Sequence, residues 1–179
     1  MNARNVSLLR GINVGGHHLI PMARLRAIYE SIGCEDVATY LQSGNVVFRR
    51  TRAPGRVAAE AEAAITAEFG HRIRILTRTH AEMKRIVAAD PFPDAEPARR
   101  LVLFLEKPLT APLAKELAHV TSGRDEAVLV GQEFHLHCPD GIGNTKLVGL
   151  LSDRRLGVAA TGRNWRTVTR LLELSGDQS

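Results

Sequence analysis

Residues 5–50 read "NVSLLRGINVGGHHLIPMARLRAIYESIGCEDVATYLQSGNVVFRR", and this stretch decides how the first half of the chain folds. Residues 5–10 are apolar on both faces of a strand. Residues 21–33 place apolar side chains every three or four positions, the spacing of an amphipathic helix. Residues 36–50 form two β-rich runs around Ser43-Gly44-Asn45, which indicates a hairpin. The stretch therefore predicts the order strand, helix, strand, strand.

The next segments complete one unit and begin another. Residues 54–70 predict an alanine-rich helix, and residues 72–79 alternate like a strand. A further helix follows over residues 79–89, opened by a capping box of Thr79 and Glu82. The second half repeats this order with a strand at 100–106, a helix at 111–121, a hairpin at 125–139, a helix at 144–157, a strand at 158–163 and a trailing helix from Asn164.

This repeated pattern predicts an α+β fold. We expect two tandem ferredoxin-like units, each βαββαβ plus a trailing helix, with antiparallel four-stranded sheets and helices packed on them. The first unit spans residues 1–90 and the second residues 99–179. The proline-rich residues 91–98 connect them.

Composition and charge indicate the kind of partner and the cellular compartment. The 179 residues carry a formal charge of +5, almost entirely from arginine, which favours anionic partners. Cys34 and Cys138 lie far apart and outside any CxxC spacing, so free thiols in a reducing cytoplasm are expected. No stretch approaches the ~20 apolar residues of a membrane span, and the N-terminus lacks an uninterrupted apolar signal region, so no membrane partner is expected.

Chain topology gathers the unusual loops. A right-handed crossover makes the first and second strands of a unit parallel, so the loop at 10–18 and the turn at 42–45 end at one edge. In the second unit the loops "PDGIGNTK" (139–146) and "TGRNW" (161–165) share the opposite end. Each unit therefore presents two loops on a single rim.

These loops supply donors suited to a phosphate or carboxylate. Lysine and arginine offer charge, helix N-termini offer unpaired N–H groups, and glycines allow positive φ or close backbone approach. The alternative is structural: glycine turns, and caps from Asn164 or Thr145. The candidate ligand-binding residues are Arg10, Asn13, Gly15, Gly16, Ser43, Asn45, Thr145, Lys146, Arg163 and Asn164.

The sequence gives little support for a metal site, a catalytic triad or base stacking on aromatic side chains. His17 and His18 are adjacent and point apart on any regular element. The "HLHC" at 135–138 could bind zinc, but no second cluster accompanies it, so half-exposed sheet histidines and no metal are expected. No Ser-His-Asp set can be assembled, and no cofactor is expected. The strand "NVVFRR" lacks the RNP1 pattern, so nucleic acid would bind through arginines and not by aromatic stacking.

Five segments together resemble a known family: residues 8–33, "TYLQSGNVVF", "DPF", "HCPDGIGNTKL" and "ATGRNWRTVTRLLEL". In order and spacing the chain is similar, from residue 6 to about 174, to the bacterial family called domain of unknown function 1697. The resemblance implies a small cytosolic α/β protein of two ferredoxin-like halves, and no established activity. Thr145 stands where that family tends to have serine, so a hydroxyl-dependent role would survive and a serine nucleophile would not.

The sequence thus predicts binding of a small anionic ligand in a cleft where the rims of the two halves converge. An enzyme acting on a phosphorylated metabolite is the second reading: Lys146 could stabilise charge, but no base stands beside it and catalytic residues are not identified. A nucleic-acid-associated or protein-interaction module is the third reading. The sequence leaves oligomeric state open.

Overall fold

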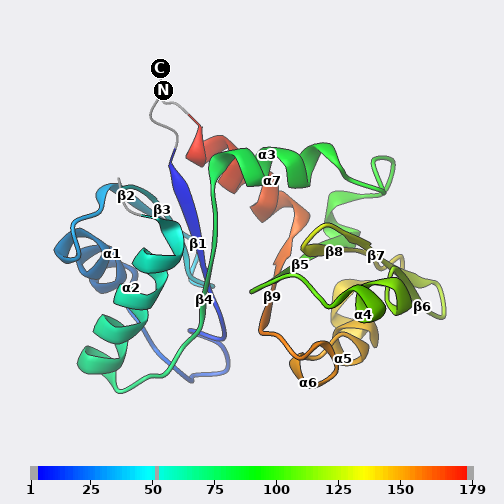
Figure 1. The fold of residues 1–179 in the computed structure, drawn as a ribbon, viewed down its shortest axis with the longest axis horizontal. Coiled ribbons are helices and arrows are strands. Elements are labelled where there is room, and N and C mark those ends of the chain that lie inside the picture. Colours follow the sequence, from blue (N-terminus) through cyan, green and yellow to red (C-terminus); the bar gives the residue numbers. More distant parts are fainter. Residues whose placement is uncertain (1–3, 51–52, 177–179) are drawn as a thin grey trace. The chain divides into compact units, whose positions relative to one another are not determined.

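The computed structural model describes residues 4–50 and 53–176. It is a mixed α/β protein with one four-stranded and one five-stranded antiparallel sheet (Figure 1). The chain forms two compact units, Met1–Lys84 with Arg170–Ser179, and Arg85–Thr169. This division differs from the expected connector at 91–98, because the helices α3 (His80–Ala88) and α7 (Trp165–Ser175) each run through a unit boundary.

The first unit follows the predicted order. Its elements are β1 (Asn5–Leu9), α1 (Met22–Ser31), β2 (Glu35–Tyr40), β3 (Asn45–Arg49), α2 (Pro54–Phe69) and β4 (Ile75–Arg78). The strands lie in the order β2-β3-β1-β4. Helices α1 and α2 lie on one side of this sheet in Figure 1 and bury Tyr29, Val57 and Ile65 against Leu9 and Phe48.

Local signals explain where these elements begin and end. Gly70 ends α2 in the left-handed conformation (φ 69°), which glycine adopts without steric cost. The capping box that opens α3 is confirmed: Thr79 N donates to Glu82 Oε2 (2.7 Å), and Glu82 N donates to Thr79 Oγ1 (3.2 Å). The hairpin expected around Ser43-Gly44-Asn45 is formed by β2 and β3.

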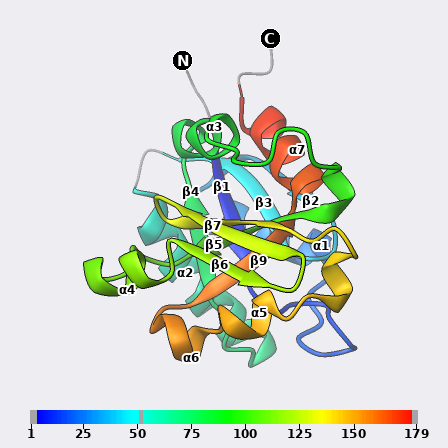
Figure 2. The same cartoon turned by 90° about the vertical axis from the view of Figure 1, so that its right-hand side faces the viewer.

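The second unit contains more elements than predicted. They are a 3-10 turn (Pro97–Arg99), β5 (Arg100–Leu105), α4 (Ala111–Glu116), β6 (His119–Ser122), β7 (Asp125–Val130), β8 (Glu133–His137), a 3-10 turn (Ile142–Asn144), α5 (Leu147–Leu150), α6 (Asp153–Leu156) and β9 (Ala160–Asn164). Their strands lie in the order β6-β7-β8-β5-β9. Figure 2 labels β5, β6, β7 and β9 of this sheet. Leucines of α4, α5 and α6 pack with Leu103 and Phe134 on one face of this sheet.

The expected four-stranded sheet is wrong here because the predicted helix at 111–121 ends at Glu116. Residues 119–122 instead pair with β7, and Ser122 lies opposite Asp125 across a two-residue turn. Gly123 adopts φ 65° in that turn, as a tight hairpin requires. Val120 and Thr121 are β-branched and favour the strand. The extra strand β6 is therefore favoured by its own residues and by the turn at Gly123, although the apolar spacing predicted a helix there.

The helix predicted over residues 144–157 is also wrong as a single element. It is split into α5 and α6 by Ser152, whose backbone is extended (φ −71°, ψ 154°). The break lets Leu147, Leu151 and Leu156 all reach the core of this unit. Gly157 ends α6 with φ 68°, as its position suggested.

Candidate functional site

The glycine loop after β1 is a closed turn. His17 N donates to the Val14 carbonyl (3.0 Å), and Gly15 and Gly16 between them have φ of 57° and 78°. Two consecutive positive φ values define the central residues of a type I′ turn, which glycine favours. Both glycines are exposed, and a Cβ on Gly16 would meet nothing within 4 Å. They serve the turn, and no other part of the described chain packs closely against Gly16.

Asn13 holds this loop against the hairpin turn. Its Nδ2 donates to the carbonyls of Ile20 (3.1 Å) and Gln42 (2.9 Å), and its Oδ1 accepts from Ile20 N (2.8 Å). These bonds engage both amide protons and the amide oxygen of the side chain. The structure therefore brings the two loops of the first rim together, with Asn13 as the structural link.

The hairpin turn is built from Gly44 and Asn45. Gly44 has φ 80°, and its carbonyl accepts from Leu9 N (2.8 Å). A Cβ there would lie 2.5 Å from Ile12 Cδ1, so this glycine permits the close approach of the two loops. Asn45 is fully buried and donates to the Tyr40 carbonyl (2.6 Å) and to Ser43 Oγ (3.2 Å). Ser43 and Asn45 thus stabilise the turn.

Two candidates of the second unit form hydrogen bonds to the start of a helix. Thr145 Oγ1 accepts from Leu147 N (3.2 Å) at the start of α5. Asn164 Oδ1 accepts from Arg166 N (3.1 Å) at the start of α7, as its position predicted. The Thr145 hydroxyl and the Asn164 amide therefore have structural roles, which the sequence had left open as the alternative to ligand binding.

Lys146 and Arg163 lie on different sides of their sheet. Lys146 is exposed beside α5, whose Leu147 packs on the core face with Leu103. Arg163 lies opposite Val102, whose neighbours in sequence belong to that core face, so its side chain leaves the other face. Arg163 is buried, and its Nη1 donates to Thr161 Oγ1 (2.9 Å) and to the Gly162 carbonyl (2.8 Å). Burial lowers the pKa of Arg163 to about 10.

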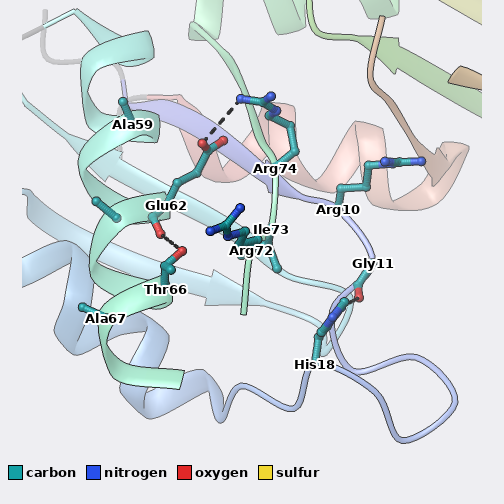
Figure 3. A pocket seen from close by; sticks show the side chains of 11 residues that line it. Arg10, Gly11, His18, Ala59, Glu62, Thr66, Ala67, Arg72, Ile73 and Arg74 are labelled. Carbon is teal, nitrogen blue, oxygen red and sulfur yellow. Dashed lines mark hydrogen bonds and ion pairs between the residues drawn. The ribbon is translucent and has the colours of Figure 1, made fainter. Parts of the chain in front are cut away.

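A cavity of about 930 Å³ lies in the first unit, between α2, the segment leading into β4 and the glycine loop (Figure 3). Arg10, Arg72 and Arg74 line it, together with Gly11 and His18 of the loop. In Figure 3 the Arg72 guanidinium points toward α2, whereas Arg10 extends away from that helix. Its lining residues are Arg10, Gly11, His18, Ala59, Glu62, Ala63, Thr66, Ala67, Arg72, Ile73 and Arg74.

The lining is strongly basic. Three arginines and one carboxylate, Glu62, line the cavity, which gives the lining a formal charge of +2. Glu62 is engaged: its Oε1 accepts from Ile75 N (2.7 Å), and its Oε2 lies 3.6 Å from Arg74 Nη1. Since β4 is an edge strand, Glu62 satisfies a backbone donor that the sheet leaves open. The cavity therefore offers guanidinium donors and an acid with structural partners.

The histidines do not form a metal centre. His18 Nδ1 lies 3.1 Å from the Gly11 carbonyl, and the His18 ring lies 5.0 Å from that of His71. His135 of "HLHC" is buried and not half-exposed, and burial lowers its pKa to about 4. Over residues 4–50 and 53–176, no three His, Cys, Asp or Glu side chains form a group that could hold a metal ion.

Arg10, a candidate from the sequence, lines this cavity, whereas the sequence did not point to Arg72, Arg74, Glu62 or Thr66. A signal was present, because the "RIR" at 72–74 alternates and so places both arginines on one side of an extended segment. The face of α2 that meets them is set by tertiary packing, which the pattern alone does not give.

The fold defines a class of two-sheet α/β proteins that occurs elsewhere. The structure of a conserved bacterial protein, SP0830 from Streptococcus pneumoniae, matches this fold with a TM-score of 0.78 and 20% sequence identity. The match covers 98% of this chain and 100% of that one.

The chain belongs to the family described as "Protein of unknown function (DUF1697)", whose profile matches residues 2–135. This confirms the family that the loops and their order suggested. None of the curated proteins matches this chain.

Proposed function

We propose that the protein binds a small anion that bears a phosphate or carboxylate group, at the arginine-lined cavity of the first unit. The observation that carries this proposal is the lining of the cavity, which contains Arg10, Arg72 and Arg74 and a single carboxylate that already has structural partners. A guanidinium presents five N–H donors in a planar fork that matches the oxygens of a phosphate or carboxylate.

The size and shape of the cavity support a ligand larger than a bare ion. About 930 Å³ lies within the range of roughly 300–1,000 Å³ that small-molecule sites occupy. One wall consists of Ala59, Ala63 and Ala67, which share a face of α2 because they are four residues apart. A ligand with an apolar body could lie on this wall while its anionic group meets the arginines.

Thermal shift with inorganic phosphate, pyrophosphate and citrate tests the proposal. Each anion that binds raises the melting temperature in proportion to RT ln(1 + [L]/Kd). We expect the shift to disappear in Arg72→Gln, whose side chain is exposed and lines the cavity. Arg56→Gln is the matched control, because Arg56 is exposed on α2 outside the cavity. Equal shifts in both variants, or none in the wild type, would refute the assignment.

Two further proposals concern the fold of the two units and the cellular compartment. We propose that both units are ferredoxin-like, supported by the order β4-β1-β3-β2 in the first and β9-β5-β8-β7 within the second. We also propose a cytoplasmic protein, supported by the free, buried thiols of Cys34 and Cys138. Two expectations from the sequence stay predictions: a cleft shared by both halves, and turnover of a phosphorylated metabolite.

A further inference from the structure

Large apolar side chains are exposed mainly at one end of the first unit. Four are exposed among the described residues: Val14 (64%), Leu19 (59%), Leu41 (52%) and Val148 (45%). The first two belong to the glycine loop, and Leu41 begins the neighbouring hairpin turn. We call Val14, Leu19 and Leu41 the apolar rim residues.

The side chain of Asn13 holds these three positions together. Val14 follows Asn13 directly, Leu19 precedes Ile20, and Leu41 precedes Gln42. Ile20 and Gln42 are the two residues whose carbonyls accept from Asn13 Nδ2. Each apolar rim residue is thus one residue away from an atom fixed by this amide, so the backbones of the three lie around it.

Three non-glycine residues of this rim have a left-handed backbone. Asn13, His18 and Leu41 have φ of 53°, 48° and 59°, three of the four positive values among the described non-glycine residues. A left-handed conformation is disfavoured for leucine, and glycine or asparagine would adopt it with less strain. Leu41 is also exposed, so neither backbone preference nor packing in the first unit explains a leucine there. Strain of this kind accompanies functional sites.

The glycine loop carries basic side chains and no acidic one. Residues 1–29 and 37–59 contain no Asp or Glu, and each segment contains four arginines. Arg24, Arg26, Arg49 and Arg50 form ion pairs with Glu68, Glu30, Asp36 and Glu60. Within the loop itself, Arg10, His17 and His18 flank the apolar rim residues and no acidic side chain separates them. This combination complements a surface that is negative at its boundary and apolar beneath.

We propose that the rim of the first unit docks on the surface of an anionic lipid bilayer. The apolar rim residues enter the boundary between headgroups and acyl chains, while Arg10 and the histidines meet the phosphates. The position of Val14 and Leu41 in two tight turns favours a bilayer over a protein as the partner. Each residue begins a turn in which its carbonyl accepts a hydrogen bond from the N–H three residues later. A deformable layer accepts separate projecting side chains, whereas a protein partner needs a matching groove.

This docking departs from the expectation that the protein has no membrane partner. That expectation rested on the lack of a spanning segment, and over residues 4–50 and 53–176 no helix is long and apolar enough to cross a bilayer. Peripheral docking through loops needs no spanning segment, because it buries only a few side chains at the interface.

Co-sedimentation with vesicles tests the inference. We expect the wild type to bind phosphatidylcholine vesicles that contain ~30% phosphatidylglycerol, which gives a strongly negative surface. It should bind pure phosphatidylcholine vesicles weakly. Its binding to the anionic vesicles should fall as the salt concentration rises. Removing one half-exposed leucine should lower binding about five- to tenfold in Leu19→Ser and in Leu41→Asn. Val148→Ser, which removes the exposed apolar side chain of the second unit, should bind as the wild type does.

Leu41→Asn separates docking from a folding defect. Asparagine tolerates the left-handed conformation better than leucine, so this variant should melt no lower than the wild type while it binds vesicles less. Wild-type binding to neither vesicle, or equal losses in Val148→Ser and Leu41→Asn, would overturn the inference. So would concentration-dependent self-association that Leu41→Asn abolishes without any vesicle binding, because the rim would then be a protein interface. The anion cavity is tested separately: Arg72→Gln should still bind vesicles, and Leu41→Asn should still respond to phosphate.

Discussion

Gly44→Ala is the most informative single change in the first unit. Gly44 lies where the hairpin turn meets the glycine loop, with φ 80° and its carbonyl bonded to Leu9 N (2.8 Å). A Cβ added there would lie 2.5 Å from Ile12 Cδ1 and 2.9 Å from Leu9 Cβ. Both neighbours are buried, and Leu9 Cβ is fixed to a strand backbone. The new methyl group must therefore push the two loops apart.

The magnitude follows from two separate effects. A left-handed conformation costs an alanine about 1 kcal/mol relative to glycine. Overpacking of a well-filled interior costs about 1–3 kcal/mol more. We expect the free energy of unfolding to fall by about 2–4 kcal/mol, which lowers the melting temperature by roughly 10 °C in a chain of this length.

Urea unfolding followed by circular dichroism measures the effect, and Gly16→Ala is the matched control. Gly16 has nearly the same φ, 78°, but a Cβ there meets nothing within 4 Å. Gly16→Ala should therefore show only the backbone cost of about 1 kcal/mol. Equal losses in the two variants would mean that the close contact with Ile12 and Leu9 does not constrain the fold, and the reasoning would fail.

Three further changes test the remaining structural claims. Asn13→Asp keeps the acceptor for Ile20 N but removes both donors, so urea unfolding should show a loss of about 2 kcal/mol; an unchanged midpoint would contradict the role of Asn13. His135 has a pKa lowered from 6.5 to about 4, mainly by burial, with Asp90 opposing and Arg100 adding to the shift. The unfolded chain takes up the proton first as pH falls, so stability should drop by about 2 kcal/mol between pH 7 and pH 5. His135→Leu should remove that part of the drop; a wild-type stability that is flat over this range would count against it. Thr79→Ala removes a helix cap and should lower stability by about 1 kcal/mol in a thermal melt, whereas no change would show that the box is dispensable.

The sequence predicted the first unit well because its signals are local. Apolar spacing at three and four gave α1, and the Ser43-Gly44-Asn45 turn gave the β2–β3 hairpin. The right-handed crossover brought the glycine loop beside that turn, and Asn13 joins them by hydrogen bonds. The family was likewise identified from the loops and their order.

The second unit was predicted less well because its elements are short. Residues 111–122 contain six helical residues and then a four-residue strand, and helical periodicity over so few positions does not distinguish the two. Arg163 looked like a surface donor by residue type, whereas its register opposite Val102 places it on a buried face. Register depends on pairing with β5, which no local pattern specifies.

The candidate site required tertiary information for a related reason. Arg72 and Arg74 come from a segment that reads only as strand, and Glu62 and Thr66 from a helix rich in alanine. Their meeting depends on α2 packing beside β4. The sequence offered the charges, and the fold decided which of them face one cavity.

Nuclear magnetic resonance mapping with inorganic phosphate tests the proposed anion site most directly. If the cavity of the first unit is the site, amide signals should shift at Gly11, at His18, over 59–67 and over 72–74. Signals over 143–147 and 162–164 should stay in place, although the sequence favoured those loops as well. Shifts confined to the loops of the second unit, or no shifts at millimolar phosphate, would contradict the account.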